Sequence, residues 1–161
     1  MLGSAIADAN VTVNQQATIR KGSYFYKELT VDNSVTPMHQ EVKVVGVKNN
    51  AGANGEDAVE EQSGKVFVPA AVESFQYDAD GNLLRDGRWS YVWDAENRLM
   101  SLTALPNVPV TAKQRLEFSY DAGGRRILKT VLSWNAQTNA YQPQKQTKFV
   151  YDGWNLVAEL E

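Results

Sequence analysis

The sequence predicts an all-β fold built from antiparallel hairpins. In the second half of the chain an aromatic residue is followed by aspartate four times, and turn residues with a short apolar run come next each time. The dipeptides are Tyr77-Asp78, Trp93-Asp94, Tyr120-Asp121 and Tyr151-Asp152. In each copy the aromatic is expected to end a strand, the aspartate to accept backbone N–H groups, and a Gly or Asn to supply positive φ. Apolar residues also alternate with a period of two along the chain, and no segment shows a convincing helical pattern.

The first half contains three segments that favour strands. Tyr24 to Val31 and Val42 to Val47 are rich in aromatic and β-branched residues, and they are separated by the turn-rich stretch from Asp32 to Pro37. Asn49 to Gly55 is rich in Asn and Gly, which predicts an exposed loop. A further strand is expected from Lys65 to Val68, ended by Pro69. The one weak helix candidate, residues 70–75, is short and partly β-branched or aromatic.

The second half is expected to be a hairpin array with irregular connections. Successive dipeptides are 16, 27 and 31 residues apart. Sixteen residues suit one tight strand-turn-strand step, whereas the later intervals leave room for loops, which we place at Ala104 to Gln114 and at Asn135 to Gln146. If register is maintained, the four corners should lie along one edge of a continuous twisted, strip-like sheet and use their aspartates alike as backbone caps. Two packed sheets are the alternative arrangement.

We divide the chain into an N-terminal β-rich region, residues 1–73, and a repeat region, residues 74–161, within one continuous folded unit. The 161 residues, 43% of them hydrophobic, are enough for one domain with a sizeable core. Repeat units of this kind bury their apolar faces only by stacking on neighbours.

The stretch from Phe75 to Leu99 resembles two consecutive units of the YD-repeat family, which includes the rearrangement-hotspot (Rhs) proteins, bacterial toxin-complex shells and teneurins. Residues 120–128 and 149–156 are looser copies, so the resemblance covers residues 74–161. It implies a β-strip of the kind that forms shells around a cargo, and a parent protein that is secreted or on the cell surface. The self-cleaving core and toxin domain of Rhs proteins are not expected in this chain, so the resemblance transfers no catalytic residue. The chain is expected to be a fragment of a longer Rhs-type protein or a truncated reading frame.

The amino-acid composition limits the classes of binding partner and says little about the cellular compartment. The net charge of −3 and the scattered Lys and Arg residues argue against a nucleic-acid partner. The chain has no Cys, which removes disulfides and thiolate chemistry but fits either a reducing or an extracytoplasmic compartment. The first ten residues lack the basic and apolar regions of a signal peptide, and no segment is expected to span a membrane. The localisation is left unassigned.

Five residues are candidates for catalysis in a small hydrolase with an acidic site in a sheet groove. They are Asp78, Asp80, Asp94, Glu96 and His39. Paired carboxylates can hydrolyse glycosides, and a lone histidine can act as a general base. The alternative interpretation is that the acids cap hairpins and that His39 is a surface or loop residue. The Asp78-x-Asp80-Gly-Asn corner lacks the spacing and the final glutamate of a calcium loop, so no metal or cofactor is expected.

The aromatic residues admit two interpretations. Tryptophan and tyrosine faces could form stacking platforms for a glycan, or they could pack from strand to strand as a ladder that fixes register. The candidate ligand-binding residues are Trp89, Tyr91, Trp93, Trp134 and Trp154. Trp154 stands apart from the others because it lies in the turn Asp152-Gly153-Trp154-Asn155.

These observations favour a non-enzymatic structural or interaction module, without excluding an enzyme. Such a strip is expected to self-associate or to pair with neighbouring repeats through its edge strands, because unpaired edges recruit further strands. A carbohydrate-binding module is the first alternative and the small hydrolase is the second.

Overall fold

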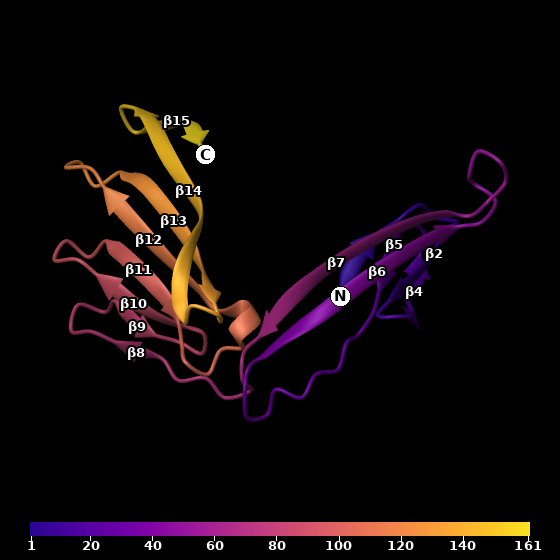
Figure 1. The fold of residues 1–161 in the computed structure, drawn as a ribbon, viewed down its shortest axis with the longest axis horizontal. Helices are drawn as coiled ribbons and strands as arrows, with labels where there is room; N and C mark the ends of the chain where they lie inside the picture. The colour runs from indigo at the N-terminus through magenta and orange to yellow at the C-terminus, as the bar shows by residue number, and fades with distance from the viewer. The chain divides into compact units, whose positions relative to one another are not determined.

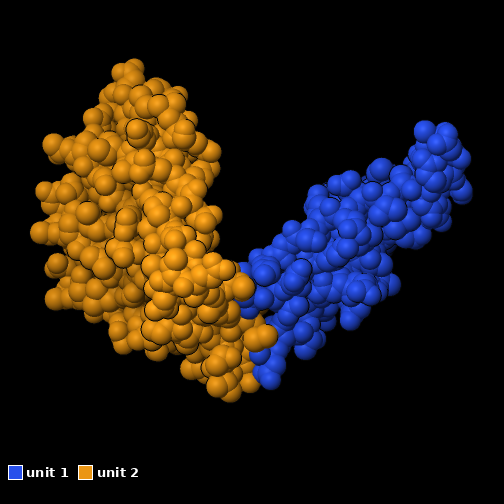
Figure 2. All heavy atoms as spheres, viewed as in Figure 1, with its two compact units in different colours: residues 1–32, 39–67 blue, residues 33–38, 68–161 orange.

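The structure is a computed structural model that describes residues 1–161, and it confirms the all-β prediction (Figure 1). The single helical element is a 3₁₀ turn, η1 (Val110–Ala112). No helix in the structure has the length and apolarity needed to cross a bilayer. The chain divides into two compact units, residues 1–32 with 39–67 (unit 1) and residues 33–38 with 68–161 (unit 2), shown in Figure 2. Each unit is described by itself.

Unit 1 contains two antiparallel sheets. The three-stranded sheet has the order β1-β5-β4 and the four-stranded sheet has the order β3-β2-β6-β7. The strands are β1 (Leu2–Ser4), β2 (Asn10–Val13), β3 (Gln16–Ala17), β4 (Ile19–Lys21), β5 (Tyr24–Tyr26), β6 (Met38–Lys48) and β7 (Ala58–Val68). A small core joins the two sheets, because Phe25 of β5 is buried with Val11 and Val13 of β2 and with Val42 of β6. The Phe25 ring lies so close to the backbone of Gly3 that a side chain there would collide with it.

The first-half strands differ from the sequence predictions in their extent. The strand expected from Tyr24 to Val31 ends at Tyr26, because its neighbours β1 and β4 are only three residues long. The Lys27 N–H donates to the Met1 carbonyl and marks the end of this pairing. The strand expected at Lys65 begins earlier, at Ala58, and ends before Pro69 as predicted. The expected strand from Val42 to Val47 lies inside β6, and residues 70–75 form no helix.

The start of β7 was not predicted because most of the strand is exposed. It occupies an edge of the four-stranded sheet and is exposed along most of its length. A strand exposed on both faces shows no apolar alternation, and its Glu60, Glu61 and Lys65 are the kind of charges that protect sheet edges. The preceding loop, residues 49–57, is exposed as expected and uses positive φ at Asn50 and Gly55.

Unit 2 is one eight-stranded antiparallel meander in which every strand pairs with its sequence neighbours, in the order β15-β14-β13-β12-β11-β10-β9-β8. The strands are β8 (Gln76–Tyr77), β9 (Leu83–Arg85), β10 (Trp89–Trp93), β11 (Leu99–Ala104), β12 (Gln114–Tyr120), β13 (Arg126–Asn135), β14 (Ala140–Asp152) and β15 (Asn155–Leu160). In a meander, successive connections alternate between the two ends of the sheet. The four aromatic-aspartate corners, which follow β8, β10, β12 and β14, therefore share one end, as predicted (Figure 1).

One of the two predicted loops is confirmed and the other is wrong. The connection between β11 and β12 contains η1, and it buries Leu105 and Val108. The expected loop from Asn135 to Gln146 is instead a tight turn followed by β14. The Asn135 side chain accepts the Gln137 and Thr138 N–H groups, which closes the turn at once. Pro143 is accommodated beside a bulge, where proline is tolerated inside a sheet.

Candidate functional site

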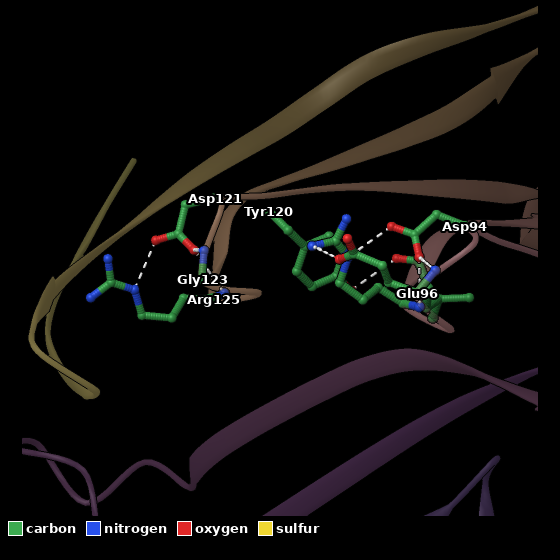
Figure 3. Close-up of polar contacts among 8 residues, drawn as sticks. Asp94, Glu96, Tyr120, Asp121, Gly123 and Arg125 are labelled. Carbon is green, nitrogen blue, oxygen red and sulfur yellow. Dashed lines mark hydrogen bonds and ion pairs between the residues drawn. The ribbon is translucent and has the colours of Figure 1, made fainter.

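Three of the four corners share one hydrogen-bonded geometry, represented by Asp94. Its Oδ1 atom accepts the backbone N–H groups of Glu96 and Arg98, each at 2.9 Å. The Asp94 N–H donates to the Arg98 carbonyl and the Asn97 N–H donates to the Asp94 carbonyl, both at 3.0 Å. The first and third corners make the same four bonds around their own aspartates. Figure 3 shows the second and third corners, with each carboxylate turned back onto its own turn.

Each of these turns requires one residue with positive φ, three positions after the aspartate. The residues are Gly81 at 86°, Asn97 at 58° and Gly124 at 79°. Only glycine, and to a lesser degree asparagine, adopts this conformation without strain. The Gly or Asn in the repeat is therefore a backbone requirement of the turn.

The second carboxylate oxygen binds the residue four positions after the aspartate. Arg98 Nε lies 2.7 Å from Asp94 Oδ2, and Arg125 Nε lies 2.7 Å from Asp121 Oδ2. In the first corner Asn82 Nδ2 takes the same place, at 2.9 Å from Asp78 Oδ2. Each carboxylate thus accepts three hydrogen bonds from its own turn.

These bonds lower the pKa of all three aspartates. For Asp94 the Arg98 backbone N–H is the main cause and the Arg98 guanidinium adds to it. The pKa of Asp121 is lowered in the same way by Arg125. For Asp78 the largest contribution is the hydrogen bond from the Asn82 side chain. A carboxylate that donates protons in catalysis needs a raised pKa, so the direction of these shifts favours a capping role.

The corners are also bonded to one another through their aromatic residues. Trp93 Nε1 donates to the Leu83 carbonyl at 2.8 Å. The hydroxyl of Tyr120 donates to the Leu99 carbonyl at 2.9 Å, and the hydroxyl of Tyr151 donates to the Arg126 carbonyl at 3.0 Å. In every case the acceptor is the residue paired across the hairpin with the preceding corner's aromatic. We call this repeated contact the corner lock.

Arginine side chains reinforce the corner lock. The Arg98 guanidinium lies 5.4 Å from the ring centre of Tyr120, and that of Arg125 lies 5.5 Å from the ring centre of Tyr151. Arg125 also donates to the Gly153 carbonyl in the fourth corner. The sequence signal for this role is the arginine four residues after the aspartate in both corners, and neither arginine was among the predicted site residues.

The fourth corner departs from the expected common role. Asp152 pairs directly with Asn155, so the turn contains only Gly153 and Trp154. Gly153 supplies a φ of 57°. None of the hydrogen bonds in the structure involves the Asp152 carboxylate, so the prediction that all four aspartates cap alike is wrong for this one. The turn is two residues long, so the backbone after Asp152 does not form the capped turn of the other three corners.

The remaining catalytic candidates are dispersed. Asp80 is exposed in the first turn, and Glu96 forms an ion pair with Arg98 at 2.6 Å. His39 lies on β6 and belongs to unit 1, whereas the four acids lie in unit 2. No three His, Asp or Glu side chains come together in a way that could hold a metal ion. The hydrolase hypothesis therefore stays a prediction, and the structure does not bring its five candidate residues together in one site.

Most candidate ligand-binding aromatics have structural contacts. The Arg88 guanidinium lies 4.7 Å from the Trp89 ring centre, and the Tyr91 hydroxyl donates to Asp86 Oδ2 at 2.7 Å. Trp134 and its cross-strand neighbour Tyr141 make an edge-on ring contact, with centres 5.0 Å apart. Trp93 belongs to the corner lock. Trp154 differs, because 75% of its surface is exposed.

Unit 1 contains an open hollow that the sequence did not indicate. It has a volume of about 910 Å³ and is lined mainly by apolar residues of β1, β6 and β7 and of the segments next to them, including Leu2, Ile6 and Val59. Lys48 and Glu60 are its only charged lining residues. This lining contains no arrangement for nucleophilic or acid-base catalysis.

No family model matches the chain. The similar curated proteins include the tRNA nuclease WapA of Bacillus subtilis strain 168 and the tRNA3(Ser)-specific nuclease WapA of Bacillus spizizenii. They are 36% and 41% identical to this chain over 84 residues, which are 52% of this chain. The match spans only 3% of the length of each of these proteins.

The capping role predicts that two similar dipeptides differ in importance. Asp94→Ala should lower the melting temperature of unit 2, because three N–H donors lose their acceptor. Asp152→Ala, the matched control, should leave it unchanged. Tryptophan fluorescence during heating checks this, since all four tryptophans lie in unit 2. Equal effects of the two substitutions would contradict the assignment.

The lowered pKa values predict a pH dependence. A carboxylate whose pKa is lower in the folded state stabilises that state fully above its unfolded pKa, about 4, and less as the pH falls through the folded pKa. The melting-temperature advantage of the wild-type protein over Asp94→Asn should therefore shrink as the pH is lowered from about 5 to about 2. A constant difference over this range would show that Asp94 ionisation does not contribute to stability.

Proposed function

We propose that this chain is a non-enzymatic structural module, a YD-repeat segment of an Rhs-type β-shell. The corner lock carries the proposal. It joins each hairpin to the one before it by the same contact three times in succession, so the meander is extended by adding further copies of one unit. Proteins that grow in this way are stabilised by nearest-neighbour contacts.

The length of the similar proteins supports this proposal. The WapA proteins are far longer than the segment that matches this chain, which fits a module repeated or embedded in a large protein. The tRNA nuclease activity for which they are named belongs to those whole proteins. For this chain we infer a scaffold role, because its net charge is −3 and two of its candidate acids, Asp78 and Asp94, are held in their own turns.

A scaffold of this kind interacts through its sheet edges. In unit 2 the outermost strands β8 and β15 each have one neighbour and one free edge, and free edges pair with further strands. The partners that we propose are neighbouring repeats or other copies of the chain.

Light scattering coupled to size-exclusion chromatography tests the interaction role. The apparent mass should rise above the chain mass of 17.9 kDa as the concentration increases toward the high micromolar range. A strict monomer throughout this range would count against the self-association. Turnover of chromogenic esters, phosphates or glycosides that is lost on substitution of a candidate acid would contradict the non-enzymatic role.

Trp154 is the observation that favours the carbohydrate-binding alternative, because the face of an exposed tryptophan can stack on a sugar ring. The structural proposal predicts that oligosaccharides leave tryptophan emission unchanged. Saturable quenching that is lost in Trp154→Ala and kept in Trp89→Phe would instead favour glycan binding. Trp89 is a suitable control because its ring is covered by Arg88.

A further inference from the structure

The first corner lacks the contact that joins the others. Trp93, Tyr120 and Tyr151 each donate a hydrogen bond to the preceding hairpin. Tyr77 occupies the same position in its corner, but β8 is the last strand of the sheet and no hairpin precedes it there. Its side chain is 60% exposed, and none of the hydrogen bonds in the structure involves its hydroxyl. The donor of a corner lock is therefore present without an acceptor.

The opposite edge presents the matching acceptor. In each corner lock the accepting carbonyl belongs to the residue paired with the preceding aromatic. On β15 that residue is Leu156, which pairs with Tyr151. Strand β15 is the outermost strand at this side of the sheet, and its Leu156, Val157 and Leu160 are exposed. One end of the meander thus offers the donor and the other end offers the acceptor.

The directions of the two edge strands are compatible. Neighbouring strands in the sheet are antiparallel throughout, so the first strand, β8, and the eighth, β15, run in opposite directions. Placing β8 of one copy beside β15 of another continues the alternation. It also brings the Asp78 corner of one copy next to the Asp152 corner of the other, at the same end of the sheet.

Resting on the proposed structural function, we propose that the partner of these edges is a second copy of this chain, bound head to tail. Strand β8 of one copy pairs antiparallel with β15 of the next, and the Tyr77 hydroxyl donates to the Leu156 carbonyl. The contact joins two different surfaces, so it continues from copy to copy and does not stop at a symmetric dimer. Strand β8 carries no charged residue, unlike β7, whose charges protect its edge. Because β8 has only two residues, the association is weak and depends on concentration.

Two variants that each block one edge test this polarity. Tyr77→Lys places a charge on the β8 edge and leaves β15 intact, whereas Leu156→Lys does the reverse. Both side chains are exposed, so the variants should fold. Each variant alone should be monomeric by light scattering. An equimolar mixture should form a heterodimer and nothing larger, because only one native pair of edges remains.

The controls separate this inference from the proposed function. Val92→Lys places a lysine at an exposed position of β10, which has a neighbouring strand on each side, and should associate like the wild-type protein. Tyr77→Phe should weaken association by roughly 2- to 10-fold, since it removes one hydrogen bond. If either lysine variant alone still forms dimers, or the mixture stays monomeric while the wild-type protein associates, the head-to-tail polarity is wrong but edge pairing stands. A wild-type protein that never associates overturns both.

Discussion

The aspartate cap is the constraint on which the repeat sheet depends. By binding two backbone N–H groups of its own turn, each capping carboxylate fixes where one strand ends and the next begins. That position decides which carbonyl faces the next hairpin, and the following aromatic donates to it. A shift of one residue would turn every side chain to the other face of the sheet. The cap thus transmits register from one hairpin to the next.

The sequence was informative where structure is set by neighbouring residues. The capped turns place a Gly or Asn of positive φ three positions after the aspartate, and the first three corners could be predicted from this spacing. Asp152 and Asn155 have the same spacing without forming a cap. The fourth dipeptide looks the same, but its apolar residue Leu156 follows Asp152 by four positions, whereas Leu99 follows Asp94 by five. That single residue separates a two-residue turn from a capped one. The corner lock was only partly foreseeable, as an aromatic ladder, because its acceptors are backbone carbonyls of another hairpin.

Strand segments without buried side chains were the parts of the fold that the sequence did not reveal. Much of β14 is polar and exposed, so its first half resembled a loop, and β7 was recognised only at its last residues. Their pairing comes from backbone hydrogen bonds to a neighbour, which leave no periodic trace in side-chain type. The short N-terminal strands escaped for another reason, since two or three residues are too few to show alternation.

The corner lock has a direction along the chain. The donor always belongs to the later hairpin and the acceptor to the earlier one, and each capped turn closes within a few residues of its own aspartate. Short closures of this kind form fast because little chain entropy is lost. During synthesis each hairpin therefore leaves the ribosome after the surface on which it docks, and the sheet can grow in the order in which it is translated.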